Sequence, residues 1–226
     1  MNKKNKLAMK GIIFDMDGVL INSMPTHFEA WRSAFIEVAN IVVDERTVYM
    51  LEGMRGIDLV NKVFELNNYD NYNLAQRVNS RKSDIFRIQF RNVPKPFVGV
   101  QELLEKSKCL KAVVSGSNRE DVTALLEQFN NINFDVIITA DDIDRGKPDP
   151  IAFITALSKM NVDKKDAIVV ENAPLGIEAA NRAGIQSFVV LNDSPLYPKD
   201  FDGKIDKRRI LKETRLASTQ LEQWCS

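Results

Sequence analysis

Five short apolar runs are spread along the chain, and stretches with helix-like spacing of apolar residues separate most of them. The runs are rich in β-branched residues, which is typical of strands buried in a parallel sheet. We predict strands at Ile12–Phe14, Ala112–Ser115, Val136–Thr139, Ala167–Val170 and Ser187–Leu191. Strands that alternate with helices or loops of this length indicate an α/β fold, a Rossmann-like parallel sheet with helices on both faces.

A long interval between the first and second predicted strands has almost no strand signal. It spans roughly 95 residues, which is too long for an ordinary crossover connection. Apolar residues at helical spacing instead predict helices over Thr26–Glu37, Arg55–Leu66 and Leu74–Phe90. We therefore expect a helical-bundle cap of residues 24–94, inserted into an α/β core of residues 1–23 and 95–226. The segment Val93-Pro94-Lys95-Pro96 is expected to form a stiff return hinge, because each proline restricts itself and its predecessor.

The charge balance limits the possible partners. The chain has 31 basic and 31 acidic residues, so its formal net charge is zero at pH 7. This balance does not favour nucleic acid or an anionic membrane as a general partner. The start, M-N-K-K-N-K-L-A-M-K, returns to lysine before any apolar stretch long enough for a signal peptide, and nothing later approaches a membrane span. We expect a soluble, cytoplasmic monomer.

Neither the tail from Asn192 to Ser226 nor the two cysteines carries a motif that predicts chemistry. We predict that a partly helical segment, Leu216 to Trp224, packs on the core rather than binding a partner. Cys109 and Cys225 lie far apart in the sequence and away from the acidic motifs. We predict that both are reduced structural thiols rather than a disulfide or a nucleophile.

Two carboxylates, Asp15 and Asp17, directly follow the first predicted strand, and Gly18 follows them. In open α/β sheets, chemistry collects just beyond the carboxyl ends of the strands. Two carboxylates that face the same way crowd one small volume unless a cation lies between them, and Mg²⁺ prefers oxygen ligands. A polar turn after a strand is the alternative reading of Asp-x-Asp-Gly.

Three further polar clusters follow later strands. Ser115, with Gly116, stands at a strand end and a helix start, where free N–H groups favour an anion such as phosphate. Lys147 lies in a proline-containing loop and can neutralise charge beside carboxylates and phosphate. Glu171 and Asn172 supply oxygen donors for a metal. Taken alone, the Ser115 cluster could be a helix cap, the Lys147 loop a solvated loop, and the Glu171-Asn172 cluster a capped turn. The common position of the three clusters at strand ends favours one shared site.

Taken together, these clusters resemble the four motifs of the haloacid dehalogenase superfamily, in the order Asp15-Met16-Asp17-Gly18, Ser115, Lys147 and Glu171-Asn172. The similarity runs along almost the whole chain, and the helical insertion is similar to the small α-helical cap of that superfamily. His27, Arg55 and Lys82 resemble cap and hinge residues of its β-phosphoglucomutase-like branch.

The resemblance implies an Mg²⁺-dependent phosphohydrolase that acts on a small phosphorylated metabolite through an aspartyl-phosphate. Asp15 would be the nucleophile and Asp17 the acid and base, while Ser115, Gly116 and Lys147 would bind phosphate. The metal would be held by Asp15, the Asp17 carbonyl and Glu171 or Asn172, directly or through water.

The fourth motif departs from many relatives, because Asn172 replaces a second acidic residue and removes one negative charge. A run of this kind resembles hydrolytic members, including an inorganic pyrophosphatase type, and Glu52 is similar to a cap carboxylate of that type. Hydrolysis of a sugar phosphate or of pyrophosphate is therefore favoured over mutase chemistry.

The sequence leaves open a second enzymatic function and a non-catalytic one. A β-phosphoglucomutase is the first alternative, and a phosphate-binding regulatory protein without catalysis is the second. Arg55 and Lys82 are candidates for gripping the distal part of the substrate, with solvated helix surface as the alternative. His27, the only histidine, is expected to be a packed or hinge-capping residue beside Trp31, with a direct proton-transfer role in Asp17 chemistry as the alternative.

Overall fold

The centre of the molecule is a parallel sheet. A computed structural model describes residues 9–69, 71–89, 94–129 and 131–225. The sheet has the order β3-β2-β1-β4-β5-β6 and all neighbouring pairs are parallel. The strands are β1 (Gly11–Phe14), β2 (Leu110–Val114), β3 (Val136–Ile138), β4 (Ala167–Glu171), β5 (Gln186–Val190) and β6 (Ile210–Leu211). The five predicted strands are confirmed, and β6, which is only two residues long, was not predicted.

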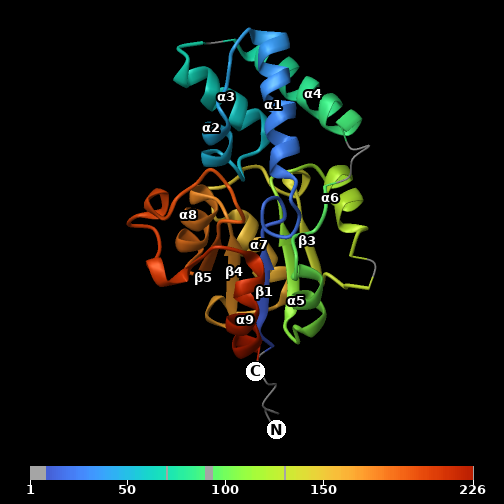
Figure 1. Cartoon of the computed structure of the whole chain (residues 1–226), viewed down its shortest axis with the longest axis vertical. Helices are drawn as coiled ribbons and strands as arrows, with labels where there is room; N and C mark the ends of the chain where they lie inside the picture. Colours follow the sequence, from blue (N-terminus) through green and yellow to red (C-terminus); the bar gives the residue numbers. More distant parts are fainter. Residues whose placement is uncertain (1–8, 70, 90–93, 130, 226) are drawn as a thin grey trace.

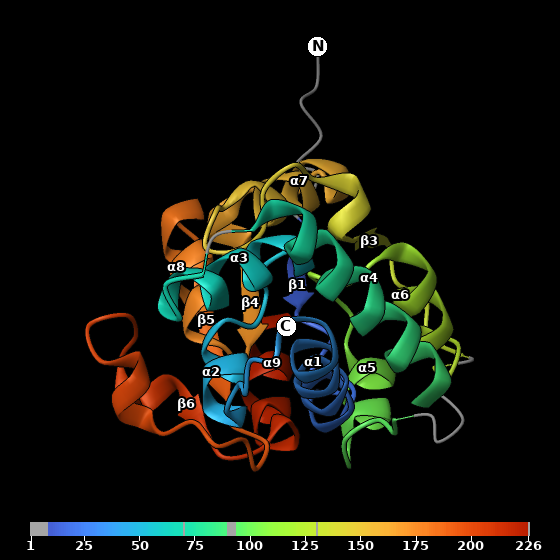
Figure 2. The same ribbon diagram turned by 90° about the horizontal axis from the view of Figure 1, so that it is seen from above.

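Strand β1 is buried on both faces because helices cover both sides of the sheet. Ile12 and Phe14 pack into one apolar cluster and Ile13 into another, as the alternation of side chains along a strand requires. Helices α5 (Val100–Lys106), α6 (Arg119–Leu126) and α9 (Ser218–Cys225) belong to the first side, and α7 (Ile151–Met160) and α8 (Pro174–Ala183) to the second (Figure 2). The Rossmann-like α/β architecture is confirmed.

Four helices form a separate layer above the carboxyl ends of the strands (Figure 1). They are α1 (Met24–Ala39), α2 (Glu45–Met50), α3 (Gly56–Leu66) and α4 (Tyr72–Gln89). They pack around their own apolar cluster, which includes Trp31, Phe35, Val60 and Phe86. The short helix α2 was not predicted. Asp44 caps its N-terminus, because the Asp44 carboxylate accepts a hydrogen bond from the Thr47 N–H at 3.0 Å. Phe90, at the end of the predicted third helix, lies outside the described residues.

Two adjacent segments connect this helical layer, which we call the cap, to the sheet layer. Asn22 N–H donates to the Lys95 carbonyl at 2.9 Å, and Phe97 N–H donates to the Leu20 carbonyl at 3.0 Å. The two chain connections between the cap and the sheet layer therefore run side by side. Of the predicted hinge, Val93 lies outside the described residues.

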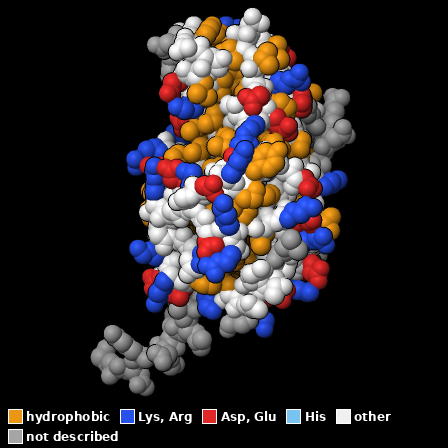
Figure 3. Space-filling view, turned by 60° about the vertical axis from the view of Figure 1, so that its left-hand side comes forward, with side chains coloured by type: hydrophobic (Ala, Val, Ile, Leu, Met, Phe, Trp, Pro, Cys, Tyr) orange, Lys and Arg blue, Asp and Glu red, His pale blue; other side chains and the backbone are white. Residues whose placement is uncertain are grey.

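The remaining regular structure consists of short 3₁₀ helices in the core. They are η1 (Ala140–Asp142), η2 (Lys164–Asp166), η3 (Pro198–Phe201), η4 (Lys207–Arg209) and η5 (Thr214–Ala217). Figure 3 shows basic and acidic side chains interspersed over one face of the molecule, in keeping with the balanced composition. Within the described ranges, no helix has both the length and the apolar character needed to cross a bilayer.

The prediction of two reduced thiols is wrong in this structure, because Cys109 and Cys225 form a disulfide with their Cα atoms 5.4 Å apart. Cys109 directly precedes β2, and Cys225 ends α9. Helix α9 packs on the same face of the sheet as α5, which brings its last residue to the start of β2. The two cysteines are 116 positions apart in sequence, so only the packing of the tail could reveal this pairing.

The packing of α9 predicts a stability effect. Leu221 is 1% exposed and belongs to the apolar cluster on this face of the sheet. We expect Leu221→Ala to lower the free energy of unfolding by about 2–5 kcal/mol, because it removes buried methyl groups and leaves a cavity. Urea-induced unfolding measures this, and Gln223→Ala on the exposed side of the same helix should cost less than about 0.5 kcal/mol. Equal midpoints for the two variants would contradict the packing.

The disulfide gives a second prediction. It closes a long loop, so Cys225→Ser should lower the free energy of unfolding by about 2–4 kcal/mol under non-reducing conditions. In strong reductant, the parent and the variant should unfold at nearly the same urea concentration. Two freely reacting thiols in the native, unreduced parent would show that the bond is absent in solution.

Candidate active site

A cavity of about 240 Å³ is lined by residues that follow the strands of the sheet and by residues of the cap. The core contributes Asp15, Asp17, Gly116, Ser117 and Asn118 to its lining, and the cap contributes His27, Glu52, Arg55, Asn79 and Lys82. Of the sequence-predicted site residues, Ser115, Lys147, Glu171 and Asn172 are buried next to these residues and joined to them by hydrogen bonds. The fold therefore brings together all the site residues that were predicted from the sequence.

Asp15 is held at the end of β1 by backbone and side-chain contacts. Its N–H donates to the Val170 carbonyl at 2.9 Å, which continues the pairing of β1 with β4. Its Oδ1 accepts a hydrogen bond from Lys147 Nζ, whereas its buried Oδ2 has no hydrogen-bond partner. Burial raises the pKa of Asp15 well above its usual range, against the opposing charge of Lys147. One oxygen is thus fixed, and the other is free to bind a ligand.

Lys147 is a buried cation between two carboxylates. It is 2% exposed, and its Nζ donates to Glu171 Oε1 at 2.6 Å as well as to Asp15. Burial would lower the pKa of Lys147, but the charges of Asp15 and Glu171 raise it above its usual value. Lys147 therefore keeps a positive charge directly beside Asp15.

Glu171, predicted as a metal ligand, is already occupied by protein donors. Its Oε2 accepts hydrogen bonds from the N–H groups of Asn172 at 2.7 Å and Ala173 at 2.8 Å. With Lys147 on the other oxygen, both oxygens of this carboxylate have partners. Glu171 therefore orients Lys147 and fixes the loop that carries Asn172.

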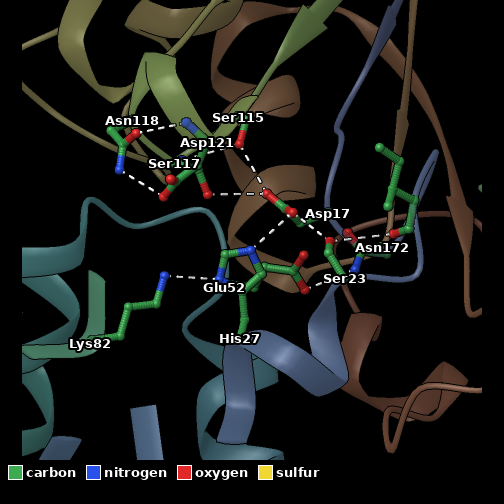
Figure 4. A network of polar contacts seen from close by, with 11 residues as sticks. Asp17, Ser23, His27, Glu52, Lys82, Ser115, Ser117, Asn118, Asp121 and Asn172 are labelled. Carbon is green, nitrogen blue, oxygen red and sulfur yellow. Dashed lines mark hydrogen bonds and ion pairs between the residues drawn. The ribbon is translucent and has the colours of Figure 1, made fainter. Parts of the chain in front are cut away.

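Hydrogen-bond donors surround Asp17 (Figure 4), and they differ from those around Asp15. The Asp17 Oδ1 accepts from Ser23 Oγ and contacts His27 Nε2 at 3.1 Å, and its Oδ2 accepts from Ser115 Oγ at 3.0 Å and Ser117 Oγ at 3.3 Å. Burial would raise the pKa of Asp17, but His27 and the serine hydroxyls hold it well below its usual range. Asp17 is therefore an ionised carboxylate surrounded by donors.

The cap side of this network is a lysine–histidine pair. Lys82 Nζ donates to His27 Nδ1 at 2.9 Å, so the other ring nitrogen, Nε2, carries the proton that faces Asp17. The His27 ring stacks on Phe86 with centroids 4.2 Å apart. Burial, followed by the charge of Lys82, lowers the pKa of His27, and burial lowers the pKa of Lys82 to about 8. His27 is thus a neutral donor that links the cap to Asp17.

Glu52 reaches from the cap into the core. Its Oε2 accepts from Asn172 Nδ2 at 2.8 Å, while its Oε1 and the Asn172 Oδ1 are buried without hydrogen-bond partners. Burial raises the pKa of Glu52 well above its usual range, and the charges of Asp15 and Glu171 add to this effect. Gly18 has a φ of +78°, and a Cβ there would lie 2.1 Å from Asn172 Nδ2, so no side chain fits beside this contact.

A loop of the cap, residues 51–55, crosses directly over the phosphate-binding candidates. Lys147 N–H donates to the Gly53 carbonyl at 3.1 Å, and Arg55 Nη1 donates to the Asp144 carbonyl. A Cβ on Gly116 would come within 2.8 Å of the Met54 carbonyl oxygen, so the close approach of this loop requires glycine there. Arg55 is therefore a contact between cap and core as well as a lining residue of the cavity.

Several residues of the site were missed by sequence reasoning. Ser23 and Ser117 donate to Asp17, and Asn118 Nδ2 donates to the buried Asp121 at 2.8 Å. The signal for Asn118 was available, because its side chain also caps α6 at the Asp121 N–H, three residues later. No sequence pattern indicated that Ser23 would donate to Asp17, because this contact depends on how the chain folds between the first motif and α1.

Comparison with known proteins agrees with this geometry. The sequence profile described as haloacid dehalogenase-like hydrolase matches residues 12–190. The chain is 31% identical over 184 residues to the phosphorylated carbohydrates phosphatase of Thermotoga maritima, covering 79% of this chain and 83% of that protein. It is 30% identical over 182 residues to the fructose-1-phosphate phosphatase YqaB of Escherichia coli, covering 78% and 94%.

The fold comparison points to one branch of this family. A solved structure from Bacteroides vulgatus, assigned by inference as a β-phosphoglucomutase, superimposes with a TM-score of 0.83 and 27% identity. The match covers 98% of this chain and 92% of that one. The profile match spans most of the chain, and Asp15, Asp17 and Lys147 lie together beneath the cap. The chain belongs to the haloacid dehalogenase-like hydrolase family, in its β-phosphoglucomutase-like branch, and is an enzyme of the phosphatase type.

Proposed function

We propose that the protein is an Mg²⁺-dependent phosphohydrolase that acts on a small phosphorylated sugar through an aspartyl-phosphate on Asp15. The contrast between the two carboxylates carries this proposal. Asp15 has one buried oxygen without a hydrogen-bond partner beside Lys147, whereas Asp17 is held by three hydroxyls and a histidine. Two neighbouring carboxylates in such different environments suit two different roles in one reaction.

Asp15 suits the nucleophile. Its Oδ2 would form a bond to phosphorus while the bond from phosphorus to the leaving oxygen breaks, and Lys147 would offset the charge of the phosphoryl oxygens. Ser115 and Gly116 directly follow β2, and Gly116 lines the cavity. We propose that Ser115, Gly116 and Lys147 hold the phosphoryl group.

Asp17 suits the acid and base. An approaching phosphate brings negative charge close to this carboxylate and so raises its affinity for a proton. Protonated Asp17 would donate to the leaving oxygen; the resulting carboxylate would then take a proton from the water that attacks the aspartyl-phosphate. His27 would keep Asp17 in position, since its Nε2 proton faces Oδ1.

The residues present fit a magnesium ion. Beside Asp15, Glu52 Oε1 and Asn172 Oδ1 are buried oxygens without hydrogen-bond partners, and oxygen is the donor that Mg²⁺ prefers. No group of three His, Cys, Asp or Glu side chains is arranged to hold a metal among the residues that the structure describes. We propose that Asp15, the Asp17 carbonyl and Asn172 bind the ion, with Glu171 and Glu52 adjacent. Bound Mg²⁺ would offset the negative charge that the carboxylates and the phosphoryl group share.

The distal part of the cavity suits a polyhydroxyl compound. It offers cations at Arg55 and Lys82, neutral polar groups at Asn79 and Asn118, and a carboxylate at Asp121. Such a mixture matches hydroxyl groups, which both donate and accept hydrogen bonds, better than the purely anionic pyrophosphate. The names of the two phosphatase relatives, which concern phosphorylated carbohydrates and fructose 1-phosphate, support the same substrate class.

A β-phosphoglucomutase is the second candidate. Asp17 is 6% exposed under the cap, and such exclusion of water would favour transfer of the phosphoryl group to a second sugar hydroxyl. The solved structure from Bacteroides vulgatus supports this alternative. Asn172 and Glu52 favour hydrolysis, because they resemble the hydrolytic members of the branch.

An activity panel tests the proposal. We expect Mg²⁺-dependent phosphate release from sugar phosphates such as fructose 1-phosphate, and a decrease of at least about a thousandfold in Asp15→Asn, which removes the nucleophile. Asp163→Asn, an exposed aspartate far from the cavity, is the matched control and should keep full activity. Glucose 6-phosphate formed from β-glucose 1-phosphate without net phosphate release would favour the mutase. No turnover of any compound would overturn both candidates.

The pKa of Lys82 predicts a pH dependence. Burial lowers the pKa of Lys82 to about 8, so its positive charge is present below that pH and lost above it. If this charge attracts the phosphorylated substrate, kcat/KM should fall as the pH rises through about 8. Lys82→Arg, which keeps its charge at higher pH, should shift this fall upward by more than about one pH unit. Identical basic limbs in the parent and the variant would exclude Lys82 as the group responsible.

A further inference from the structure

The C-terminal tail contacts helix α2 of the cap, and this contact is separate from the chain connections between cap and core. Arg46 of α2 donates from Nη1 to the Pro195 carbonyl at 2.9 Å and from Nη2 to the Asp200 carboxylate. Its guanidinium lies over the Tyr197 ring, 5.7 Å from the centroid. The tail, in orange and red, lies next to α2 in both ribbon views (Figures 1 and 2). The segment that carried no sequence motif thus supplies a binding site for a cap arginine.

An apolar contact supports the same junction. Tyr49 of α2 is 5% exposed and packs in a cluster with Leu196 and Phe201 of the tail and Ile177 of α8. This cluster is separate from the apolar clusters at the centres of the cap and the sheet. Cap and core therefore share an apolar contact on this side.

The tail side of the junction is firmly built. The Asp200 side chain is 8% exposed, and its second oxygen accepts from the Tyr197 N–H at 2.8 Å. Asp200 thereby caps η3, the turn that also carries Phe201. Asp200 is buried and Arg46 is only partly exposed, so their pair is better shielded from water than the Arg87–Glu120 pair, in which both partners are exposed.

Helix α2 leads directly into the loop that covers the active site. Its last residue is Met50, and residues 51–55 follow with Glu52 on Asn172 and the Gly53 carbonyl on the Lys147 N–H. A rigid helix fixed at Arg46 and Tyr49 leaves this loop little freedom, because Glu52 lies less than one helical turn beyond Tyr49. The loop that carries Glu52 and Arg55 is thus connected to the tail through α2.

We propose that Arg46, Tyr49 and Asp200 form a latch through which the C-terminal tail holds the cap loop of residues 51–55 closed over the active site. They are positioning residues, since none of them lines the cavity. The kinetic consequence rests on the proposed phosphatase function, but the latch itself does not.

The latch has a distinct kinetic signature. A substrate that binds only the closed form has its apparent affinity reduced by the fraction of molecules that are closed. Weakening the latch should therefore raise KM, while kcat changes little because the bound complex is closed in both proteins. A merely structural defect would do the opposite, since it would reduce the active fraction and leave KM unchanged.

Kinetics with the best substrate of the panel test this signature. We expect Arg46→Ala and Asp200→Asn each to raise KM about fivefold with kcat within about twofold. The double variant should be little worse than either single one, because both remove the same interaction. Arg208→Ala is the matched control, because Arg208 pairs with Asp206 inside the tail, and it should leave KM unchanged. An unchanged KM in Arg46→Ala, or an equal rise in the control, would overturn the latch.

Hydrogen exchange of the free protein tests the latch without any activity. Arg46→Ala should speed amide exchange in residues 48–55 by about fivefold relative to the parent, whereas Arg208→Ala should leave these amides unchanged. Unchanged exchange there in Arg46→Ala would reject the latch even if the phosphatase function holds. Faster exchange in a protein that turns over nothing would keep the latch and reject the function.

Discussion

The buried cation of Lys147 is the interaction on which the site depends. It lies between Asp15 at the end of β1 and Glu171 at the end of β4, two strands that pair in the sheet. Without it, two carboxylates would be buried close together with no opposing charge, which costs several kcal/mol per ion. Lys147 is itself attached to the cap through the Gly53 carbonyl. One side chain thus connects both strands, and its backbone connects the cap.

Around this cation, the sheet and the cap each contribute part of the site. The sheet fixes Asp15, Asp17 and Ser115 because neighbouring parallel strands end at the same edge. The cap adds His27, Glu52 and Lys82, which approach the same cavity from the other side. Asp15 and Asp17 differ in environment because Lys147 reaches only the first, while hydroxyls and His27 surround the second. The proposed division of roles between nucleophile and acid–base group rests on that difference.

The tail has a structural role on two sides of the core. At its C-terminal end, α9 packs on the same face of the sheet as α5 and is joined to the start of β2 through the Cys109–Cys225 disulfide. At the other end, the segment around Asp200 contacts α2 of the cap. A segment without catalytic motifs thereby affects both the stability of the core and the position of the cap. Its sequence is uninformative because its contacts are with distant residues.

The sequence by itself determined the parallel strands, the helical insertion and the residues of the four motifs. These features depend on local patterns: β-branched runs, helical spacing, and polar residues directly after a strand. Only the tertiary structure decided which donors surround Asp17, that both Glu171 oxygens are occupied, and that the cysteines form a disulfide. The strand β6 and the helix α2 were also decided only by the tertiary structure, because two and six residues are too short to show a periodic pattern in the sequence. The physical reason is that such contacts join residues many positions apart, so they follow from packing and not from local sequence.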